Sequence, residues 1–483
     1  MEEVTLLIGD RDAAASRNAT FNRLNPVTGE VATKASAASV EDARAAADAA
    51  AAAFPKWAAL GPNERRKRLL KAADLLEAKA QQFATLGLAE MGATIGWGHF
   101  NVHFAANILR EAAAMTTQVT GEVVPSDVPG NLAMAIRQPA GVVLGIAPWN
   151  AAIILGVRAI AMPLACGNTV ILKASEVCPA SHRLIGTVMK EAGMGEGVVN
   201  VITHDPKDAE AIAEALISHP AVRRVNFTGS TRVGRILAQV AAKHLKPILL
   251  ELGGKAPLVV LDDADLDAAV NATVFGAFAN SGQICMSTER VIVDEKVADE
   301  FAHKLAKRVS ALPAGDPNKG EVVIGSVVGK ATVERVQRLL TEAVAKGAKV
   351  LVGGESNGTV MQGVVVDRVT PQMQLFREES FAPQVSITRV RSVDEAVQLA
   401  NDTEYGLSAA VFGKNLARAL DVARRIDSGI CHVNGPTVHD EAQMPFGGVK
   451  GSGYGRFGGK AAIDEFTELR WITVQTGPRH YPF

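Results

Sequence analysis

Short apolar runs alternate with longer helical segments along the chain from Gly141 to Leu252. The apolar runs, which we expect to be strands, are Gly141–Ala147, Thr169–Lys173, Val198–Thr203, Val222–Phe227 and Ile248–Leu252. The expected helices between them are Ala151–Cys166, Ala180–Ala192, Lys207–Ser218 and Arg232–His244. Right-handed crossovers through helices of this length give a parallel sheet with helices on both faces, and such a sheet buries its strands. The pattern therefore predicts an α/β fold.

The length of the chain, 483 residues, predicts more than one domain, because a single hydrophobic core stops growing at roughly 250–300 residues. A second alternating section from Leu258 to about Asn434 is enough for a second α/β domain. Its expected strands are Val291–Asp294, Lys349–Val352, Val364–Val369, Val385–Arg391 and Ala409–Phe412. Glycines then gather at Gly447-Gly448 and in Gly451–Gly459. We expect that stretch to be a loop, too flexible to form a helix or strand.

Charge and cysteine content exclude several classes of protein. The net charge of −1 gives no field that would attract nucleic acid or an anionic membrane surface. The four cysteines are too scattered for a disulfide framework or a CxxC metal site, which indicates a reducing compartment and no metal. Met1–Asp10 lacks the basic start and apolar core of a signal peptide. We therefore expect a cytoplasmic protein that binds a small molecule.

One apolar stretch, Ala140–Val157, has the length of a membrane span. It carries the turn residues Pro148-Trp149-Asn150 in its middle, and Arg158 follows it directly. We therefore expect a buried strand followed by a helix, and no contact with a membrane.

Ligands of parallel sheets bind beyond the carboxyl ends of the strands, which here are four turns. These turns are Pro148–Asn150, Lys173–Glu176, Thr228–Ser230 and Glu251–Gly254. At Thr228–Ser230 a strand end, a glycine and a helix start would present free N–H groups to an anion. The chain has neither a G-x-G-x-x-G fingerprint nor a P-loop there, so an ordinary strand-to-helix turn remains an alternative.

Cys285 and Glu251 are the candidate nucleophile and base. A thiol attacks as thiolate, so it needs a nearby base or a positive dipole, and hydrolysis of a thioester also needs a base. Glu251 ends an apolar strand, where it should face the same crevice as Cys285. The alternatives are a small buried hydrophobic residue for Cys285 and, for Glu251, an ion pair with Lys173 or Lys255.

Asn150 has two possible roles. Its side-chain amide could donate to a developing oxyanion beside a backbone N–H. It could equally cap the helix expected at Ala151–Cys166, because asparagine is a favoured N-cap residue.

Taken together, seven short motifs resemble the aldehyde dehydrogenase superfamily in their order and spacing. They are Pro148-Trp149-Asn150, Lys173-Ala174-Ser175-Glu176, Phe227-Thr228-Gly229-Ser230, Glu251-Leu252-Gly253-Gly254-Lys255, Gly282-Gln283-Ile284-Cys285, Glu379-Ser380-Phe381 and Pro445-Phe446-Gly447-Gly448. The resemblance covers nearly the whole chain. Ser287 stands where the family often has alanine or glycine, and Ala382 stands where glycine is common.

The resemblance implies that Cys285 is the nucleophile, Glu251 the base and Asn150 part of the oxyanion hole. It implies NAD as the cofactor, bound by Ala147, Pro148, Trp149, Lys173, Ser175, Glu176, Gly229, Ser230, Gly234, Leu252, Glu379 and Phe381. Within the superfamily, the chain is most similar to bacterial enzymes that act on aromatic aldehydes such as salicylaldehyde, vanillin or benzaldehyde. The residues that would line the substrate tunnel are Trp97, Ile154, Arg158, Ile284 and Phe446. A salt bridge on a helix face is the alternative role for Arg158.

The family architecture also implies the domain division. We expect a Rossmann-like NAD-binding domain at residues 1–116 and 140–252, and a catalytic domain at 253–459. Residues 117–139 and 460–483 would form a β arm that joins a homodimer or homotetramer. Three other functions remain open: oxidation of aliphatic or diverse aldehydes, transfer of the acyl group to coenzyme A, and a non-catalytic role.

Overall fold

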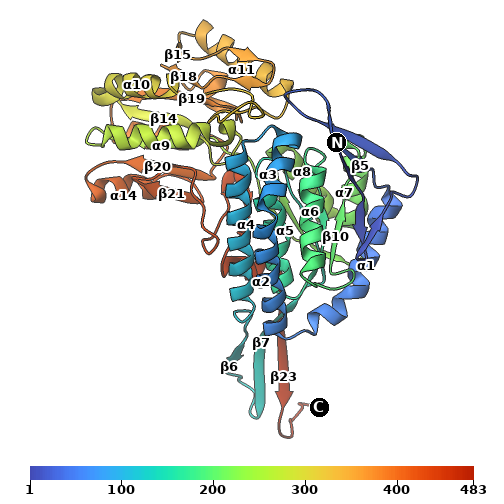
Figure 1. The fold of residues 1–483 in the computed structure, drawn as a ribbon. Coiled ribbons are helices and arrows are strands. Elements are labelled where there is room, and N and C mark those ends of the chain that lie inside the picture. Colours follow the sequence, from blue (N-terminus) through green and yellow to red (C-terminus); the bar gives the residue numbers. More distant parts are fainter.

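A computed structural model describes residues 1–483, and its first sheet has eight strands (Figure 1). In order across the sheet they are β22 (Gly453–Tyr454), β12 (Ile248–Glu251), β11 (Val222–Thr228), β8 (Val142–Ile146), β9 (Thr169–Lys173), β10 (Val199–Ile202), β2 (Leu6–Ile8) and β3 (Arg11–Ala13). Strands β12 to β10 are parallel to one another. The edge strands β22 and β3, and β2 beside β3, pair antiparallel with their neighbours. The centre of the sheet is therefore the predicted parallel array.

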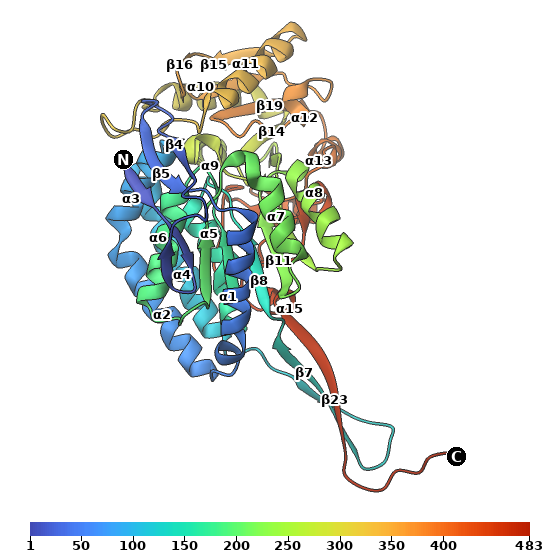
Figure 2. The same ribbon diagram turned by 90° about the vertical axis from the view of Figure 1, so that its right-hand side faces the viewer.

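Helices cover both faces of this sheet (Figures 1 and 2). One apolar cluster packs against α2 (Pro62–Ala78), α3 (Ala80–Met91), α4 (Ile95–Met115), α5 (Ala152–Ala165) and α6 (Pro179–Glu191). The cluster on the other face includes residues of α1 (Val40–Ala58), α7 (Ala209–Ser218) and α8 (Thr231–Lys243). All five residues of β9 are buried, as expected for a strand that is covered on both sides.

The second sheet has seven strands and lies above the first in Figure 1. Its order is β15 (Lys349–Val352), β18 (Val364–Asp367), β19 (Gln384–Val390), β14 (Thr288–Asp294), β13 (Ala256–Val260), β20 (Ser408–Phe412) and β21 (Ile430–Val433). Only the edge strand β15 pairs antiparallel. The accompanying helices are α9 (Leu266–Phe278), α10 (Glu295–Ser310), α11 (Lys330–Ala345), α12 (Gln374–Arg377), α13 (Val393–Asn401) and α14 (Leu416–Arg424).

A three-stranded arm projects from the body of the molecule (Figure 2). It consists of β6 (Glu122–Val124), β7 (Asn131–Pro139) and β23 (Thr467–Gln475), and β23 follows the short helix α15 (Ala461–Glu465). Strand β23 pairs with β7 along its whole length. The arm leaves large apolar side chains in water, including Val123 at 70% and Trp471 at 78% exposure.

The structure confirms the α/β fold and the expected strands of both sheets. The apolar stretch 140–157 is divided between β8 and α5. No helix of the chain is both long enough and apolar enough to cross a membrane. The structure also has N-terminal strands that the sequence did not predict: β2 and β3 in the large sheet, and β1 (Glu2–Val4), β5 (Val31–Ser36) and β4 (Thr20–Leu24) in a small one.

The prediction that the glycine-rich stretch after Gly451 forms no strand is wrong. Gly453 and Tyr454 form β22, which pairs with Leu250 and Glu251 at the end of β12. Gly453 has a φ of +106°, and a Cβ atom there would lie 2.0 Å from the Leu250 carbonyl oxygen. Glycine is present because the two backbones approach too closely for a side chain.

We expect Gly453→Ala to destabilise the protein far more than Gly354→Ala. Both glycines have a φ of +106°, but a Cβ at Gly354 would meet no atom within 4 Å. The control therefore includes the backbone strain without the clash. In thermal unfolding at one scan rate, Gly453→Ala should melt at least about 3 °C below the control. Equal melting temperatures would show that the β12–β22 contact contributes little.

Candidate active site

A continuous cleft runs along the carboxyl edge of the first sheet. Two cavities of about 300 and 570 Å³ form it. They share five lining residues, Pro148, Trp149, Thr228, Gly229 and Ser230. The smaller cavity reaches Cys285, Glu251 and Asn150, whereas the larger extends to Lys173 and Glu176. The predicted turns at this edge of the sheet therefore border one cleft.

Cys285 follows a turn with unusual backbone geometry. Asn280 and Ser281 have φ values of +47° and +56°, a left-handed conformation that costs free energy for residues other than glycine. A Cβ atom on Gly282 would lie 2.0 Å from the Ala382 carbonyl oxygen, so this turn packs directly against the 382 backbone. The half-buried thiol is thus fixed at the end of the cleft between α9 and β14.

Glu251 is the last residue of β12, and its side chain is only 1% exposed. Neither oxygen of the Glu251 carboxylate has a hydrogen-bond partner. Burial raises the pKa of Glu251 to about 7, although the neighbouring Cys285 thiol and the Arg158 guanidinium lower it in part. An ion pair of Glu251 with Lys173 or Lys255 is therefore wrong: Lys255 pairs with Glu289 instead, and no salt bridge joins Lys173 to Glu251.

The thiol and the carboxylate affect each other. Desolvation raises the pKa of the Cys285 thiol well above its ordinary value, and the negative charge of Glu251 raises it further. The resting thiol is therefore protonated at neutral pH. Glu251 is the neighbouring group that can take up this proton, because a pKa of about 7 leaves a large carboxylate fraction at that pH.

Asn150 is not a helix cap. Helix α5 begins at Ala152, and its cap position is Ala151, which makes no side-chain cap bond. One N–H of the Asn150 amide donates to the Gln283 carbonyl at 3.0 Å, which fixes the plane of the amide and leaves the second N–H available. The backbone N–H of Cys285 donates to no backbone carbonyl. These two donors are available for an oxyanion at Cys285.

The far end of the cleft contains charged groups and a helix N-terminus. Ser230 caps α8, accepting from the Val233 N–H at 3.4 Å, so the start of α8 faces the cleft. Burial lowers the pKa of Lys173, and the charge of half-buried Glu176 opposes that shift. Ala147 and Ser175 also line this end. The N-terminus of α8 therefore offers the cleft a site for an anionic group such as a phosphate.

Gly234 and Leu252 were both predicted to bind the cofactor. Leu252 lines the cleft, but Gly234 does not. A Cβ atom on Gly234 would lie 2.5 Å from Leu252 Cδ2. Gly234 therefore allows α8 to pack against Leu252.

Glu379 and Phe381 line the cleft near Cys285. The Glu379 carboxylate accepts from the Gly254 N–H at 3.0 Å. Desolvation raises its pKa to about 7, with a further contribution from the charge of Glu289. The Phe381 ring meets Trp149 edge-on, with centroids 5.8 Å apart.

The five expected tunnel residues lie around one apolar cluster, and Arg158 is the charged member. Ile154, Ile284 and Phe446 belong to the cluster, and Trp97 packs against it. The Trp97 indole donates to the Asn150 carbonyl at 3.1 Å.

Arg158 is only 7% exposed, forms an ion pair with Asp440 and lies 4.4 Å above the Phe446 ring. Arg158 therefore forms a salt bridge, as the alternative predicted, but the pair is buried and does not lie on an exposed helix face. Asp440 follows Arg158 by 282 residues, so no sequence spacing indicated the contact.

Several residues at or next to the cleft were not predicted. Gln283 is buried within the cysteine motif, and its side-chain oxygen accepts from the Val328 N–H at 2.8 Å. Val328, Thr332 and Arg335 close the cleft from the second sheet's side. Nothing in the sequence marks these three, because Val328 lies just before an ordinary amphipathic helix, α11, and Thr332 and Arg335 lie in the first half of that helix.

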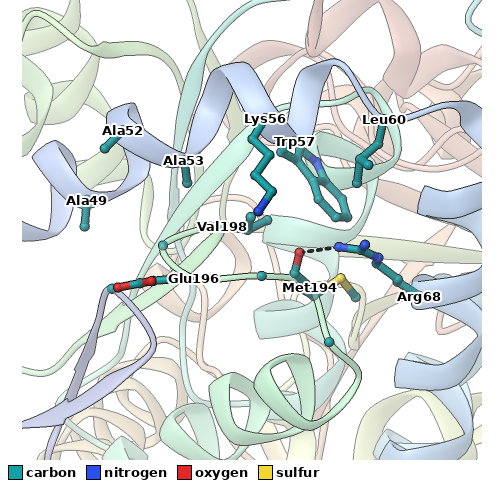
Figure 3. A pocket seen from close by; sticks show the side chains of 14 residues that line it. Ala49, Ala52, Ala53, Lys56, Trp57, Leu60, Arg68, Met194, Glu196 and Val198 are labelled. Atoms are coloured by element: carbon teal, nitrogen blue, oxygen red, sulfur yellow. Dashed lines mark hydrogen bonds between the residues drawn. The ribbon is translucent and has the colours of Figure 1, made fainter.

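A separate cavity of about 550 Å³ shares no lining residue with the cleft (Figure 3). It lies between the end of α1 and the loop 193–198, and Figure 3 shows Lys56 above that loop. Arg68 donates to the Met194 carbonyl at 2.9 Å. The cavity contains no cysteine beside a carboxylate, so it is not a candidate for the same chemistry.

Residues 13–472 match the model of the aldehyde dehydrogenase family. The chain belongs to the aldehyde dehydrogenase family. It is 61% identical, over 100% of both chains, to a vanillin dehydrogenase of Pseudomonas sp. strain HR199. Among solved structures it resembles a salicylaldehyde dehydrogenase from Pseudomonas putida G7 complexed with salicylaldehyde, with a TM-score of 0.98 and 49% identity over 100% of both chains.

It also resembles PnpE from a Pseudomonas species, solved in complex with nicotinamide adenine dinucleotide, with a TM-score of 0.95 and 36% identity over 99% of both chains. This aldehyde dehydrogenase is therefore an aldehyde-oxidising oxidoreductase that uses a nicotinamide cofactor.

The pKa of Glu251 predicts the pH dependence of turnover. Only the carboxylate accepts a proton, so activity should fall as the pH drops through about 7 and Glu251 becomes protonated. The value of kcat/KM should decrease about tenfold per pH unit below that point, because kcat/KM reports the pKa of the free enzyme. Glu251→Gln should abolish this dependence, whereas Glu379→Gln should keep it. A profile that stays flat down to about pH 5.5 would contradict the assignment.

Proposed function

We propose that this aldehyde dehydrogenase oxidises an aromatic aldehyde to its carboxylate with NAD, through a thioester on Cys285. The observation that best supports this proposal is the buried Glu251 carboxylate, which is unpaired and lies beside the Cys285 thiol at the end of the cleft. Such a carboxylate is costly to bury in the absence of a chemical role.

The proposed reaction begins with proton transfer from Cys285 to Glu251. The sulfur then forms a bond to the aldehyde carbon, and the carbonyl oxygen becomes an oxyanion. The free N–H of the Asn150 amide and the Cys285 N–H would hold that oxyanion. The Asn150 amide is already oriented, because its other N–H donates to the Gln283 carbonyl.

The bound cofactor supplies a hydride acceptor for the carbon held on Cys285. A thioester then remains on the sulfur. Glu251 releases the thiol proton to solvent and, again a carboxylate, takes a proton from a water molecule. The water oxygen bonds to the acyl carbon, and the C–S bond breaks to release the carboxylic acid, which ionises to the carboxylate. The sulfur leaves as a thiolate and regains the proton held by Glu251.

The cofactor roles follow the positions in the cleft. We assign the adenosine ribose to Lys173 and Glu176 and the pyrophosphate to Ser230 and the Gly229 turn. We assign the nicotinamide ribose and ring to Glu379 and Phe381. Ala147, Pro148, Trp149, Ser175 and Leu252 would form the walls. Gly234 is assigned indirectly, through the packing of α8 on Leu252.

The aromatic substrate is proposed from the vanillin and salicylaldehyde relatives together with the apolar surroundings of Cys285. Trp97, Ile154, Ile284 and Phe446 lie in or against the same apolar cluster as the cysteine. Arg158 would interact with a ring hydroxyl group, because its guanidinium retains N–H groups beyond the one that bonds Asp440. Oxidation of a wide range of aldehydes is the alternative.

The remaining proposals concern assembly and location. We retain the domain division at residues 1–116 with 140–252, 253–459, and 117–139 with 460–483. The exposed apolar side chains of the arm support a homodimer or homotetramer in which the arm contacts another subunit. Four free cysteines support a cytoplasmic location.

We expect a preference for NAD over NADP that depends on Glu176. The carboxylate would accept hydrogen bonds from a ribose 2′-hydroxyl and repel a 2′-phosphate. Glu176→Gln should lower the ratio of kcat/KM for NAD to that for NADP by about tenfold. Lys207→Gln, at another lining residue, is the control. An unchanged ratio would remove Glu176 from the cofactor assignment.

The proposed reaction is tested by NADH formation from benzaldehyde, with and without coenzyme A. We expect turnover that does not require coenzyme A, because water is the acyl acceptor. Cys285→Ser should lower turnover by at least about 10³-fold while NAD binding is retained, since a serine hydroxyl is a far weaker nucleophile. Cys431→Ser, at another half-buried cysteine, should keep wild-type turnover. Wild-type activity in Cys285→Ser would refute the mechanism.

A further inference from the structure

Glu289 is a buried carboxylate that the proposed reaction does not use. It lies four residues after Cys285, at the start of β14, and is 4% exposed. Both of its oxygens accept from the Ser380 N–H at 2.9 Å, and one accepts from the Ser380 hydroxyl at 2.8 Å. The Phe381 N–H donates to it at 3.2 Å. A single carboxylate thus binds the backbone of the segment 379–381.

Lys255 provides the counter-charge. It lies four residues after Glu251, and its ammonium forms an ion pair with Glu289. The side chain of Lys255 is completely buried, and that of Glu289 is nearly so. A buried ion pair is maintained only where further hydrogen bonds satisfy its groups. Ser380 and Phe381 supply those bonds.

The segment 379–381 has a conformation that requires external support. Phe381 has a φ of +48°, in the left-handed region. The Ser380 carbonyl accepts two hydrogen bonds from Arg335, at 3.2 and 2.9 Å. Glu379 and Phe381, the residues on either side of Ser380, both face the cleft.

We propose that Glu289 is a positioning residue that fixes Glu379 and Phe381 for the nicotinamide end of the cofactor. Through Lys255 and Ser380 it connects the segments that carry the base, the nucleophile and the cofactor contacts. This inference rests on the proposed cofactor role of Glu379 and Phe381. It adds that the left-handed conformation at Phe381 depends on a carboxylate four residues after the nucleophile.

The alternative is that Lys255–Glu289 only stabilises the second domain. The chain offers a control for that role in the ion pair between Asp367 and Arg389, on β18 and β19 of the same sheet, in which the carboxylate is buried and the arginine side chain is 22% exposed. Asp367 is 4% exposed, like Glu289, and neither partner lines the cleft. A purely structural role would give Glu289→Gln and Asp367→Asn the same consequences.

Calorimetric titration with NAD and alkylation by iodoacetamide separate the two roles. In Glu289→Gln, we expect the Kd for NAD to rise about tenfold, because the ordered loop must form during binding. The rate of Cys285 alkylation without cofactor should remain within about twofold of wild type. Asp367→Asn should bind NAD as the wild type does.

A double-mutant cycle tests whether Glu289 acts through the segment 379–381. In a Phe381→Ala background, Glu289→Gln should raise the Kd by clearly less than the tenfold expected in the wild-type background, because only its effect through Glu379 remains. If Glu289→Gln leaves Lys255 unpaired and does not fold, Lys255→Met/Glu289→Gln removes the orphaned charge and should still bind NAD weakly.

Wild-type affinity for NAD in either folded variant would overturn the proposal. So would a full tenfold effect in the Phe381→Ala background, or equal losses in Asp367→Asn. Failure of the proposed mechanism has a different signature, namely turnover that survives Cys285→Ser.

Discussion

The Glu251 carboxylate lies almost completely out of water at the end of a strand, and no protein group bonds to it. Burial without a partner disfavours its charged form, which raises the pKa to about 7. The same desolvation keeps the neighbouring Cys285 thiol protonated at rest. The two groups form a pair in which one can give the proton that the other can take. This pairing requires a rigid scaffold, because either group would otherwise rotate into solvent.

The scaffold consists of the two sheets and the segments between them. Strand β12 is held between β11 and β22, so Glu251 cannot move independently of the first sheet. Cys285 lies in the segment that connects α9 to β14 of the second sheet. A Cβ atom on Gly254 would lie 2.2 Å from the Cys285 carbonyl oxygen. The base and the nucleophile are therefore brought together by backbone packing, with almost no space for relative movement. Lys255, Glu289 and Ser380 extend the same fixed arrangement to the cofactor end of the cleft.

Sequence periodicity was sufficient for the regular parts of the fold and not for contacts between distant segments. Strand β9 was predicted with its bounds, since a buried strand between turn residues has a clear apolar run. The N-terminal strands β2 and β3 were missed because three residues give no periodicity. The glycines near Gly453 indicated a loop, since the sequence does not reveal which backbone approaches them. The partners of Arg158 and Lys255 lie 282 and 34 residues away, and only the folded chain identifies them.

The most direct test of the paired Glu251 and Cys285 is mass spectrometry of Glu251→Gln after mixing with NAD and benzaldehyde. Glu251→Gln should slow the first turnover, because Glu251 takes the thiol proton. If Glu251 also activates the hydrolytic water, the steady-state rate should fall further than the first turnover, and NADH should appear in a burst of about one equivalent per site. An acyl group should then be found on Cys285. If the first turnover is slowed as much as the steady state and Cys285 carries no acyl group, Glu251 activates the thiol alone, and the proposed hydrolytic role is wrong.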